Sequence, residues 1–258
     1  MFGFRAGSSR TATRAADGRK TAAPHCKLPP VPLSATAIIP ARNEEAALRK
    51  TIEAVKTTPG VSHVVVVDNG SSDNTAKVAE AMGAEVIHSS GEHGKGGALL
   101  AGVIHARDFS PDAFLLADGD LGESAAELEA LLSALDGETP VAIAAFPKSV
   151  ASGGGFGLVK NFARRSIHRR TGFSPVEPLS GQRALLASAL ENIPGFAPGF
   201  GAEVGMTLDL LESGIIPVEI PVSLSHRPTG KSLPGFAHRA RQGMDVIRAV
   251  RGERLKWK

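Results

Sequence analysis

The chain has 258 residues, of which 42% are hydrophobic, so it can bury the core of one large domain. Its single cysteine, Cys26, excludes an internal disulfide and is typical of a reducing compartment. No stretch reaches the roughly 18 to 20 apolar residues that span a bilayer, and the start lacks the apolar region of a signal peptide. We therefore expect a cytoplasmic protein.

The positive charge of the chain lies at its two ends. Residues 1–34 carry a net charge of +5 and residues 226–258 a net charge of +7, so the overall charge of +3 leaves −9 for the body. The body of the domain is therefore acidic, which argues against a basic face that binds nucleic acid, so we expect no nucleic-acid partner. Residues 1–34 lack apolar periodicity and predict a disordered basic arm, either a solvated tail or a tether to an anionic surface.

Regular alternation begins at residue 35. Apolar runs predict strands at 35–39, 64–67 and 85–88 and a further strand ending at Asp118, and amphipathic stretches between and after them predict helices at 43–57, 75–82, 97–107 and 124–135. Strands rich in Val, Ile and Leu that alternate with helices indicate an α/β fold, a mostly parallel sheet with helices on both faces. Ligands of such sheets bind at the carboxyl ends of the strands.

Polar segments follow the first two strands. After the first, Pro40 to Glu45 reads Pro-Ala-Arg-Asn-Glu-Glu, where Asn43 is expected to cap the next helix. After the second, Asp68 to Thr75 is crowded with short hydrogen-bond acceptors. A turn and a cap explain Asp73 and Thr75 but not Asp68, whose place at the end of a Val-rich strand suits a base or ribose.

Glycines surround Lys95 in the segment Gly-Glu-His-Gly-Lys-Gly-Gly, residues 91–97. A lysine between glycines can reach a phosphate, and the helix behind it adds a favourable dipole, although a flexible surface loop is the alternative. The chain has neither a Walker A sequence nor Gly-x-Gly-x-x-Gly after the first strand. This argues against a P-loop NTPase and an ordinary dinucleotide enzyme.

Asp118 and Asp120 follow the fourth apolar run, with one glycine between them. Side chains alternate along an extended segment, so we expect both carboxylates on one side, where they can share a hard divalent cation such as Mg or Mn. Asp-x-Asp is also common in turns.

Together these four segments resemble the nucleotide-sugar-binding half of GT-A glycosyltransferases, which have a Rossmann-like fold, and especially family 2. The resemblance covers residues 35–135. Three later segments, 177–183, 196–205 and 224–228, look like those of glucosyl-3-phosphoglycerate synthases and related mannosyl enzymes, which transfer sugar with retention.

The resemblance implies a role for each matching residue. The residues that would contact uridine are Pro40, Ala41, Glu44 and Asp68, and Asn69 would contact the ribose region. Lys95 would bind the diphosphate, Asp120 and His226 would bind the metal, and Asp118 would contact ribose or metal-bound water. The sugar would be bound by Leu179, Ser180 and Glu203. Asp120, Lys95, Leu179, Ser180 and Glu203 are the catalytic candidates. His226 could instead be a surface histidine, and Glu203 an acid at a helix start.

One departure leaves the acceptor open. Phe156 stands where the phosphoglycerate enzymes place a basic residue that grips the acceptor phosphate. Four basic side chains could still serve an anionic acceptor, or simply form a solvated helix face: Lys148, Lys160, Arg164 and Arg165.

The chain therefore divides into an arm (1–34), a GT-A domain (35–230, with a donor half 35–135 and an acceptor half 136–230) and a basic amphipathic helix (231–258) that packs on the domain or meets anionic lipid. We expect a metal-dependent glycosyltransferase that moves a sugar from UDP-glucose or a similar donor to an anionic acceptor such as 3-phosphoglycerate. The alternatives are a polyprenyl-phosphate glycosyltransferase, a sugar-phosphate nucleotidyltransferase and a nucleotide-sugar sensor. Peripheral contact with the inner membrane face and a homodimer stay open.

Overall fold

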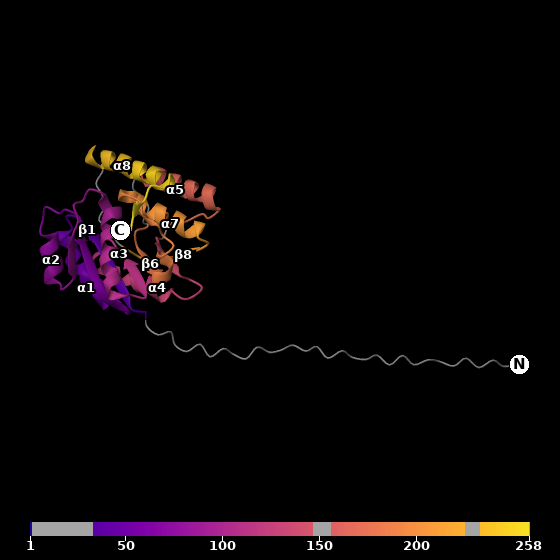
Figure 1. Cartoon of the computed structure of the whole chain (residues 1–258), viewed down its shortest axis with the longest axis horizontal. Coiled ribbons are helices and arrows are strands. Elements are labelled where there is room, and N and C mark those ends of the chain that lie inside the picture. Colours follow the sequence, from indigo (N-terminus) through magenta and orange to yellow (C-terminus); the bar gives the residue numbers. More distant parts are fainter. Residues whose placement is uncertain (2–32, 147–155, 225–232, 258) are drawn as a thin grey trace. The chain divides into compact units, whose positions relative to one another are not determined.

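A computed structural model describes residue 1 and residues 33–146, 156–224 and 233–257. In this part seven strands form one sheet in the order β3-β2-β1-β4-β6-β5-β8, and β7 pairs with β9. Figure 1 labels β1, β6 and β8 of the large sheet. The strands are β1 Ala35–Ala41, β2 Val61–Asp68, β3 Glu85–His88, β4 Ala113–Leu116, β5 Val141–Ala145, β6 Arg183–Leu186, β7 Gly195–Phe196, β8 Val218–Pro221 and β9 Leu255–Lys256. The predicted arm, 1–34, lies almost entirely outside the described residues, and the three domain boundaries stay a prediction.

The large sheet is mostly parallel, as the sequence predicted. β1 pairs in parallel with β2 and β4, β2 with β3, and β5 with β8. Only β6, between β4 and β5, is antiparallel within this sheet. Because β1, β2 and β4 run the same way, the segments that follow them meet at one edge.

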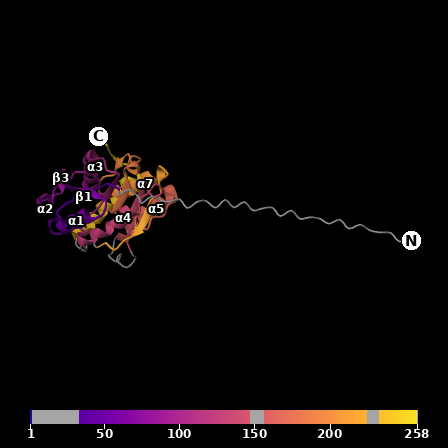
Figure 2. The ribbon, with the colours of Figure 1, turned by 90° about the horizontal axis from the view of Figure 1, so that it is seen from below.

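Helices cover both faces of the sheet, as Figure 2 shows for α1 and α4 on one side and α3 and α7 on the other. The α-helices are α1 Glu45–Thr57, α2 Thr75–Ala81, α3 Gly94–Ala106, α4 Glu129–Ser133, α5 Phe156–Thr171, α6 Ala187–Leu190, α7 Ala202–Glu212 and α8 Leu233–Val250. Three short 3-10 helices, Arg107–Phe109, Gly122–Leu128 and Gly199–Gly201, complete the set described here. None of the helices in the described part is long and apolar enough to cross a membrane.

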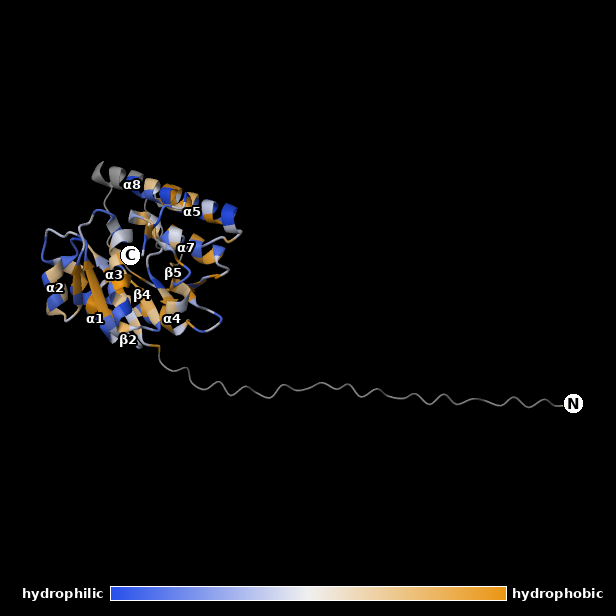
Figure 3. Cartoon of the chain, in the orientation of Figure 1, coloured by the Kyte–Doolittle hydropathy of each residue, from blue (hydrophilic) through white to orange (hydrophobic). Residues whose placement is uncertain are grey.

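Strand residues alternate between two hydrophobic cores. In β1, Ile39 packs with α1 and α2 while its neighbour Ile38 packs with α3 and α7. The strands accordingly carry the most hydrophobic colours in Figure 3. Alternation of this kind, with both faces buried, is what a sheet with helices on both sides requires.

A third core joins α5, α7 and α8. It contains Ala163 and Ile167 from α5, Val204 and Leu208 from α7, and Val246 and Ala249 from α8. The end of α8 therefore packs on the domain. Met244 is 51% exposed, because the buried side of this helix runs through Val246 and Ala249.

Several predicted boundaries differ from the structure. The fourth strand ends at Leu116, two residues before Asp118, because a turn begins at Gly119. The helix predicted for 124–135 is a 3-10 helix, Gly122–Leu128, followed by the short α4. α3 begins at Gly94, three residues earlier than predicted, which places Lys95 in its first turn.

Candidate active site

The segments after β1 and β2 are fastened to each other by reciprocal hydrogen bonds. Asn43 donates its backbone N–H to Ser71 Oγ at 3.0 Å, and its Oδ1 accepts the Ser72 N–H at 2.8 Å. The prediction that Asn43 caps α1 was wrong, because a φ of 58° turns its side chain to the neighbouring segment. The backbone donors at the start of α1 are instead satisfied by the segment after β2. Glu44 donates its N–H to Thr75 Oγ1, and Glu45 donates its N–H to Asp73 Oδ2.

Asp68 and Asn69 lie at the end of β2, beside Ala41. Asp68 is buried, accepts the Ser71 N–H at 3.1 Å and meets His88 Nδ1 at 3.2 Å. Asn69 donates its N–H to the Ala41 carbonyl oxygen at 2.9 Å. The buried Oδ1 of Asn69 has no hydrogen-bond partner within the described part of the chain.

The Asp-Gly-Asp turn lies against the first of these segments. A Cβ on Gly119 would come within 3.4 Å of Ala41 Cβ and Glu44 Cγ. Thr51 of α1 holds the turn, donating its hydroxyl to the Gly119 carbonyl at 2.9 Å and accepting the Gly122 N–H at 2.8 Å. The structure therefore brings together the ends of β1, β2 and β4. Pro40, the other candidate on β1 besides Ala41, is in register with Val67 of β2.

Asp118 is held on both of its oxygens. Lys95 Nζ donates to Oδ1 at 2.5 Å, and Gln182 Nε2 donates to Oδ2 at 2.6 Å. Gln182 is buried and also accepts from Ser180 Oγ at 3.3 Å. Sequence reasoning gave Gln182 no role, because its partner lies 64 residues away and leaves no local pattern.

Lys95 joins the two halves of the site. Its Nζ lies 2.8 Å from Glu203 Oε1 as well as 2.5 Å from Asp118, and the lysine and Glu203 side chains are 18% and 5% exposed. Burial alone would lower the pKa of Lys95, but the carboxylates of Asp118 and Glu203 outweigh burial and raise it above its ordinary value. The lysine is therefore positively charged at neutral pH.

The glycines beside Lys95 serve close packing. A Cβ on Gly96 would lie 1.9 Å from the Ala197 carbonyl oxygen, and one on Gly94 would lie 3.2 Å from Gly199 Cα. A Cβ on Gly181 would lie 2.3 Å from Lys95 Nζ. The alternative of a flexible surface loop is thus wrong, since α3 is packed against the segment that leads to Glu203.

A buried arginine, Arg183, connects the segment of Ser180 to α7. Arg183 is fully buried, donating through Nε to the Ser180 carbonyl oxygen at 2.9 Å and through Nη1 to Thr207 Oγ1 at 3.0 Å. Thr207 in turn donates to the Glu203 carbonyl oxygen at 2.9 Å. Burial lowers the pKa of Arg183 to about 10. Leu179, the neighbour of Ser180, is partly buried against the core of α5, α7 and α8.

The donor set at the Asp-Gly-Asp turn fits a hard cation that arrives with phosphate oxygens. Asp120 is half-buried, whereas His226 lies outside the described residues. No group of three or more His, Cys, Asp or Glu side chains in the described part could hold a metal by itself. Mg and its analogues are commonly bound by one or two carboxylates plus substrate phosphates, and Asp120 suits that arrangement.

The basic residues considered for the acceptor are partly committed elsewhere. Lys160 Nζ lies 2.5 Å from Glu177 Oε1, and Arg164 donates to the carbonyl oxygens of Pro175 and Val176 at 2.8 and 2.7 Å. Of the other two, Arg165 is exposed on α5, while Lys148 lies outside the described residues, as does the segment 147–155 before Phe156.

A mostly parallel α/β sheet with acidic, amide and lysine side chains gathered at its carboxyl edge defines a glycosyltransferase of the GT-A fold. The chain belongs to glycosyl transferase family 2, whose family model matches residues 36–200.

Individual relatives agree with this assignment. A polyprenol monophosphomannose synthase of Mycolicibacterium smegmatis is 27% identical over 76% of this chain and 78% of its own length. An uncharacterized glycosyltransferase of Mycobacterium tuberculosis is 30% identical over 76% of this chain and 88% of its own. The solved glucosyl-3-phosphoglycerate synthase of M. tuberculosis, in complex with Mn²⁺, UDP-glucose and phosphoglyceric acid, matches with a TM-score of 0.66 and 25% identity, covering 84% of this chain and 80% of that one.

Proposed function

We propose that this enzyme transfers a hexose from UDP-glucose, or a similar UDP-sugar, to a small acceptor that carries a phosphate, such as 3-phosphoglycerate. The observation that carries the proposal is the placement of Lys95 between Asp118 and Glu203. One cation thereby joins the end of β4, where a diphosphate would lie, to α7, where the sugar would lie.

The candidate residues have distinct places in this proposal, with Asp118 at the ribose or at metal-bound water. Pro40, Ala41, Glu44, Asp68 and Asn69 form the pocket for uridine and ribose, where the unpartnered Asn69 Oδ1 accepts a hydrogen bond from the ligand. Asp120, with His226, holds Mn²⁺ or Mg²⁺, which stabilises the charge of the leaving diphosphate when bound. Lys95 assists at the same oxygens, while Leu179, Ser180 and Glu203 hold the sugar.

We further propose that the anomeric configuration is retained. The acceptor hydroxyl oxygen bonds to the anomeric carbon as the bond to the diphosphate breaks, and the hydroxyl proton passes to a phosphate oxygen of the acceptor. Asp118 and Glu203 are both paired with Lys95, which favours attack and departure on one face of the sugar over attack by a carboxylate. Proton NMR of the product tests this, since an inverted anomer would require a general base.

The first experiment measures UDP release from UDP-glucose with Mn²⁺ and 3-phosphoglycerate. We expect turnover by the full chain and a loss of about a hundredfold or more in Asp120→Asn. Glu123→Gln is the matched control, because it removes one negative charge three residues away, where Glu123 only pairs with the exposed Lys50 at 2.7 Å. Binding of UDP without turnover of any UDP-sugar would contradict the proposal and favour the sensor.

A polyprenyl phosphate is the second candidate acceptor, supported by one surface. The exposed sides of α5 and α8 carry the apolar Leu158, Phe162 and Met244, at 80%, 42% and 51% exposure, together with the exposed Arg165 and Arg248. Apolar and basic side chains in this combination suit an anionic membrane surface. Turnover with a short polyprenyl phosphate and co-sedimentation with phosphatidylglycerol vesicles, but not with phosphatidylcholine vesicles, would favour it.

A further inference from the structure

The turn Gly199–Gly201 sets the separation between the two elements that hold Lys95 and Glu203. On one side it meets the start of α3, where Gly199 donates its N–H to the His93 carbonyl oxygen at 2.9 Å. On the other side α7 begins at Ala202, immediately after the turn, and Glu203 lies in its first turn. A shift of this turn would therefore change the distance between the lysine and the glutamate.

A carboxylate of α8 holds the same turn from behind. Asp245 is 6% exposed, and its Oδ2 accepts the Phe200 N–H at 3.2 Å. The fit leaves no space, because a Cβ on Gly199 would lie 2.1 Å from that oxygen and one on Gly201 would lie 2.5 Å from the Asp245 carbonyl oxygen. Gly199 has a φ of +59°, which other residues rarely adopt. The turn is thus enclosed between α3 and α8.

The position of Asp245 is unfavourable for a carboxylate. Its neighbours Val246 and Ala249 are buried in the apolar core of α5, α7 and α8. Burial raises the pKa of Asp245, although the Phe200 N–H and the nearby Arg248 and Arg241 oppose that shift. Packing alone would be satisfied by an apolar side chain, so the bond from the Phe200 N–H is a contact that the carboxylate adds.

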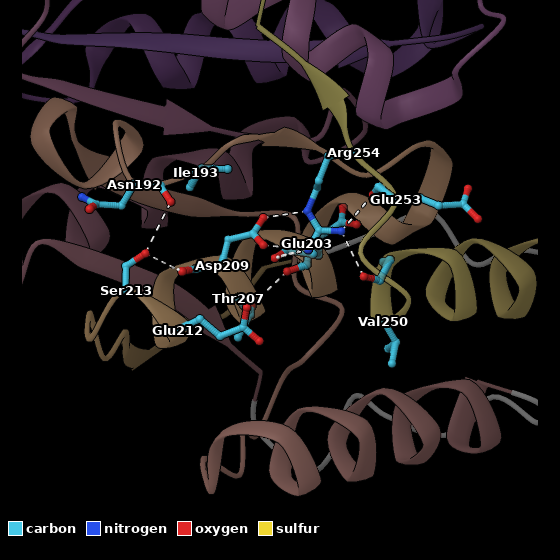
Figure 4. Close-up of polar contacts among 12 residues, drawn as sticks. Asn192, Ile193, Glu203, Thr207, Asp209, Glu212, Ser213, Val250, Glu253 and Arg254 are labelled. Carbon is cyan, nitrogen blue, oxygen red and sulfur yellow. Dashed lines mark hydrogen bonds and ion pairs between the residues drawn. The ribbon is translucent and has the colours of Figure 1, made fainter.

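α8 does not need Asp245 for its own attachment. Beyond the helix, Arg254 forms a fork with Asp209, from Nε to Oδ2 at 2.7 Å and from Nη2 to Oδ1 at 2.8 Å (Figure 4). Trp257 donates its indole N–H to the Ile193 carbonyl oxygen at 2.6 Å and packs edge-on against Phe196. These contacts fix the end of the chain independently. Asp245 itself accepts from the turn through Oδ2, and its Oδ1 lies 3.8 Å from Nη1 of the exposed Arg248 in its own helix.

We propose that Asp245 is a positioning residue for the transfer reaction, which fixes the Gly199–Gly201 turn through the Phe200 N–H and thereby holds Glu203 against Lys95. The inference rests on the proposed function in one respect, namely that Glu203 binds the donor sugar. It adds to the site a residue that touches no substrate and lies 42 positions after Glu203 in the chain.

The test compares Asp245→Ala with Asp245→Asn. Because the alanine variant loses the acceptor of the Phe200 N–H, we expect kcat with UDP-glucose to fall roughly tenfold or more. The asparagine variant keeps an acceptor oxygen and should recover most of kcat. Affinity for UDP alone, measured by calorimetry, should stay unchanged in both variants, since Asp68 and Asn69 lie on other elements.

Asp209→Asn is the matched control. It weakens the Arg254 fork, which also anchors the end of α8, but it does not touch the turn. We expect a change in kcat of less than about twofold. An equal loss of kcat in Asp209→Asn and Asp245→Ala would overturn the proposal, because general loosening of the chain end would then explain both.

Hydrogen exchange at the Phe200 amide gives a readout that needs no turnover. It should accelerate in Asp245→Ala but not in Asp209→Asn, and equal exchange in both would refute the positioning role. If wild type turns over no UDP-sugar, the proposed function fails. The exchange rates of the Phe200 amide in the two variants still decide whether Asp245 holds the Gly199–Gly201 turn. Emission of Trp257, the single tryptophan, reports whether each variant is folded, and the asparagine variant carries the test if the alanine variant is not.

Discussion

The donor half and the acceptor half of the site are built by different means. In the donor half, exposed segments after β1 and β2 are joined by hydrogen bonds such as those of Asn43 with Ser71 and Ser72. In the acceptor half, polar groups are buried and paired over long distances in the chain, as in Glu203 with Lys95, which reaches it from the donor half, and Arg183 with Thr207.

This difference has an energetic consequence. An exposed hydrogen bond that is lost is replaced by water, so one substitution in the donor half costs little stability. A buried charge that loses its partner keeps its full desolvation cost, so substitutions at Lys95 and Glu203 affect the stability of the fold as well as activity. The comparison predicts that the two halves respond differently to matched substitutions.

Lys95→Met should have the largest effect. It leaves the buried Glu203 and the carboxylate of Asp118 without their shared cation, so we expect the free energy of unfolding to fall by about 3 kcal/mol and turnover to fall about a hundredfold or more. Because the pKa of Lys95 is raised above 10.5, its contribution is complete below pH 10.5 and is lost only as the pH rises further. Urea denaturation and initial rates measure both effects.

Lys50→Met provides the contrast for Lys95, since Lys50 pairs with Glu123 at the surface. We expect it to leave turnover and unfolding unchanged. If the two lysine variants lose equal stability, the buried ion pairs of the acceptor half are not the stabilising contacts that the geometry suggests.

Thr207→Val should have an intermediate effect. Valine keeps the shape of threonine but removes the oxygen that accepts from Arg183, leaving a fully buried guanidinium with one bond fewer. We expect the free energy of unfolding to fall by about 1–3 kcal/mol, measured by urea denaturation. Thr57→Val is the control, because that hydroxyl lies exposed at the end of α1 and bonds only to its own helix; equal losses would contradict the comparison.

Asp73→Asn should have the smallest effect. The exposed Asp73 accepts from Thr75 and from the Glu45 N–H, and an amide oxygen can keep part of this set. The Thr75 hydroxyl lowers the pKa of Asp73, so its contribution is present above pH 3.8 and is lost as the pH falls further. Melting curves should coincide at pH 7, with wild type losing slightly more stability below pH 3.8; a large difference at pH 7 would contradict the comparison.

The sequence predicted the donor half well because its signals are local. The Val-rich run that ends at Asp68 and the strand Glu85–His88 were located from their own residues, and both lie where expected. The main miss was the 3-10 helix Gly122–Leu128, since apolar spacing does not distinguish it from the start of an α-helix.

Glycine was harder to interpret from sequence. Gly94 and Gly96 were interpreted as giving Lys95 access to a phosphate, with a flexible loop as the alternative, whereas in the structure they allow α3 to approach the turn before α7. An approach of that kind depends on a segment about 100 residues later, which no local pattern contains.

The acceptor half was predicted only through resemblance, and the reason is physical. Gln182, Thr207 and Asp245 act through partners that are brought close by tertiary packing, so their types and spacing carry no signal. Ser180 and Glu203 were found because they belong to segments that resemble a known family. The positions that support them became visible only in the folded chain.

The hydrogen bonds between the segments after β1 and β2 have a consequence for how a nucleotide would bind. Because hydrogen bonds of Asn43, Glu45, Asp73 and Asn74 hold these segments to each other, we expect binding of a nucleotide to cost little conformational entropy. For the proposed nucleotide site we therefore expect an association rate that is set by encounter and charge rather than by ordering of the protein.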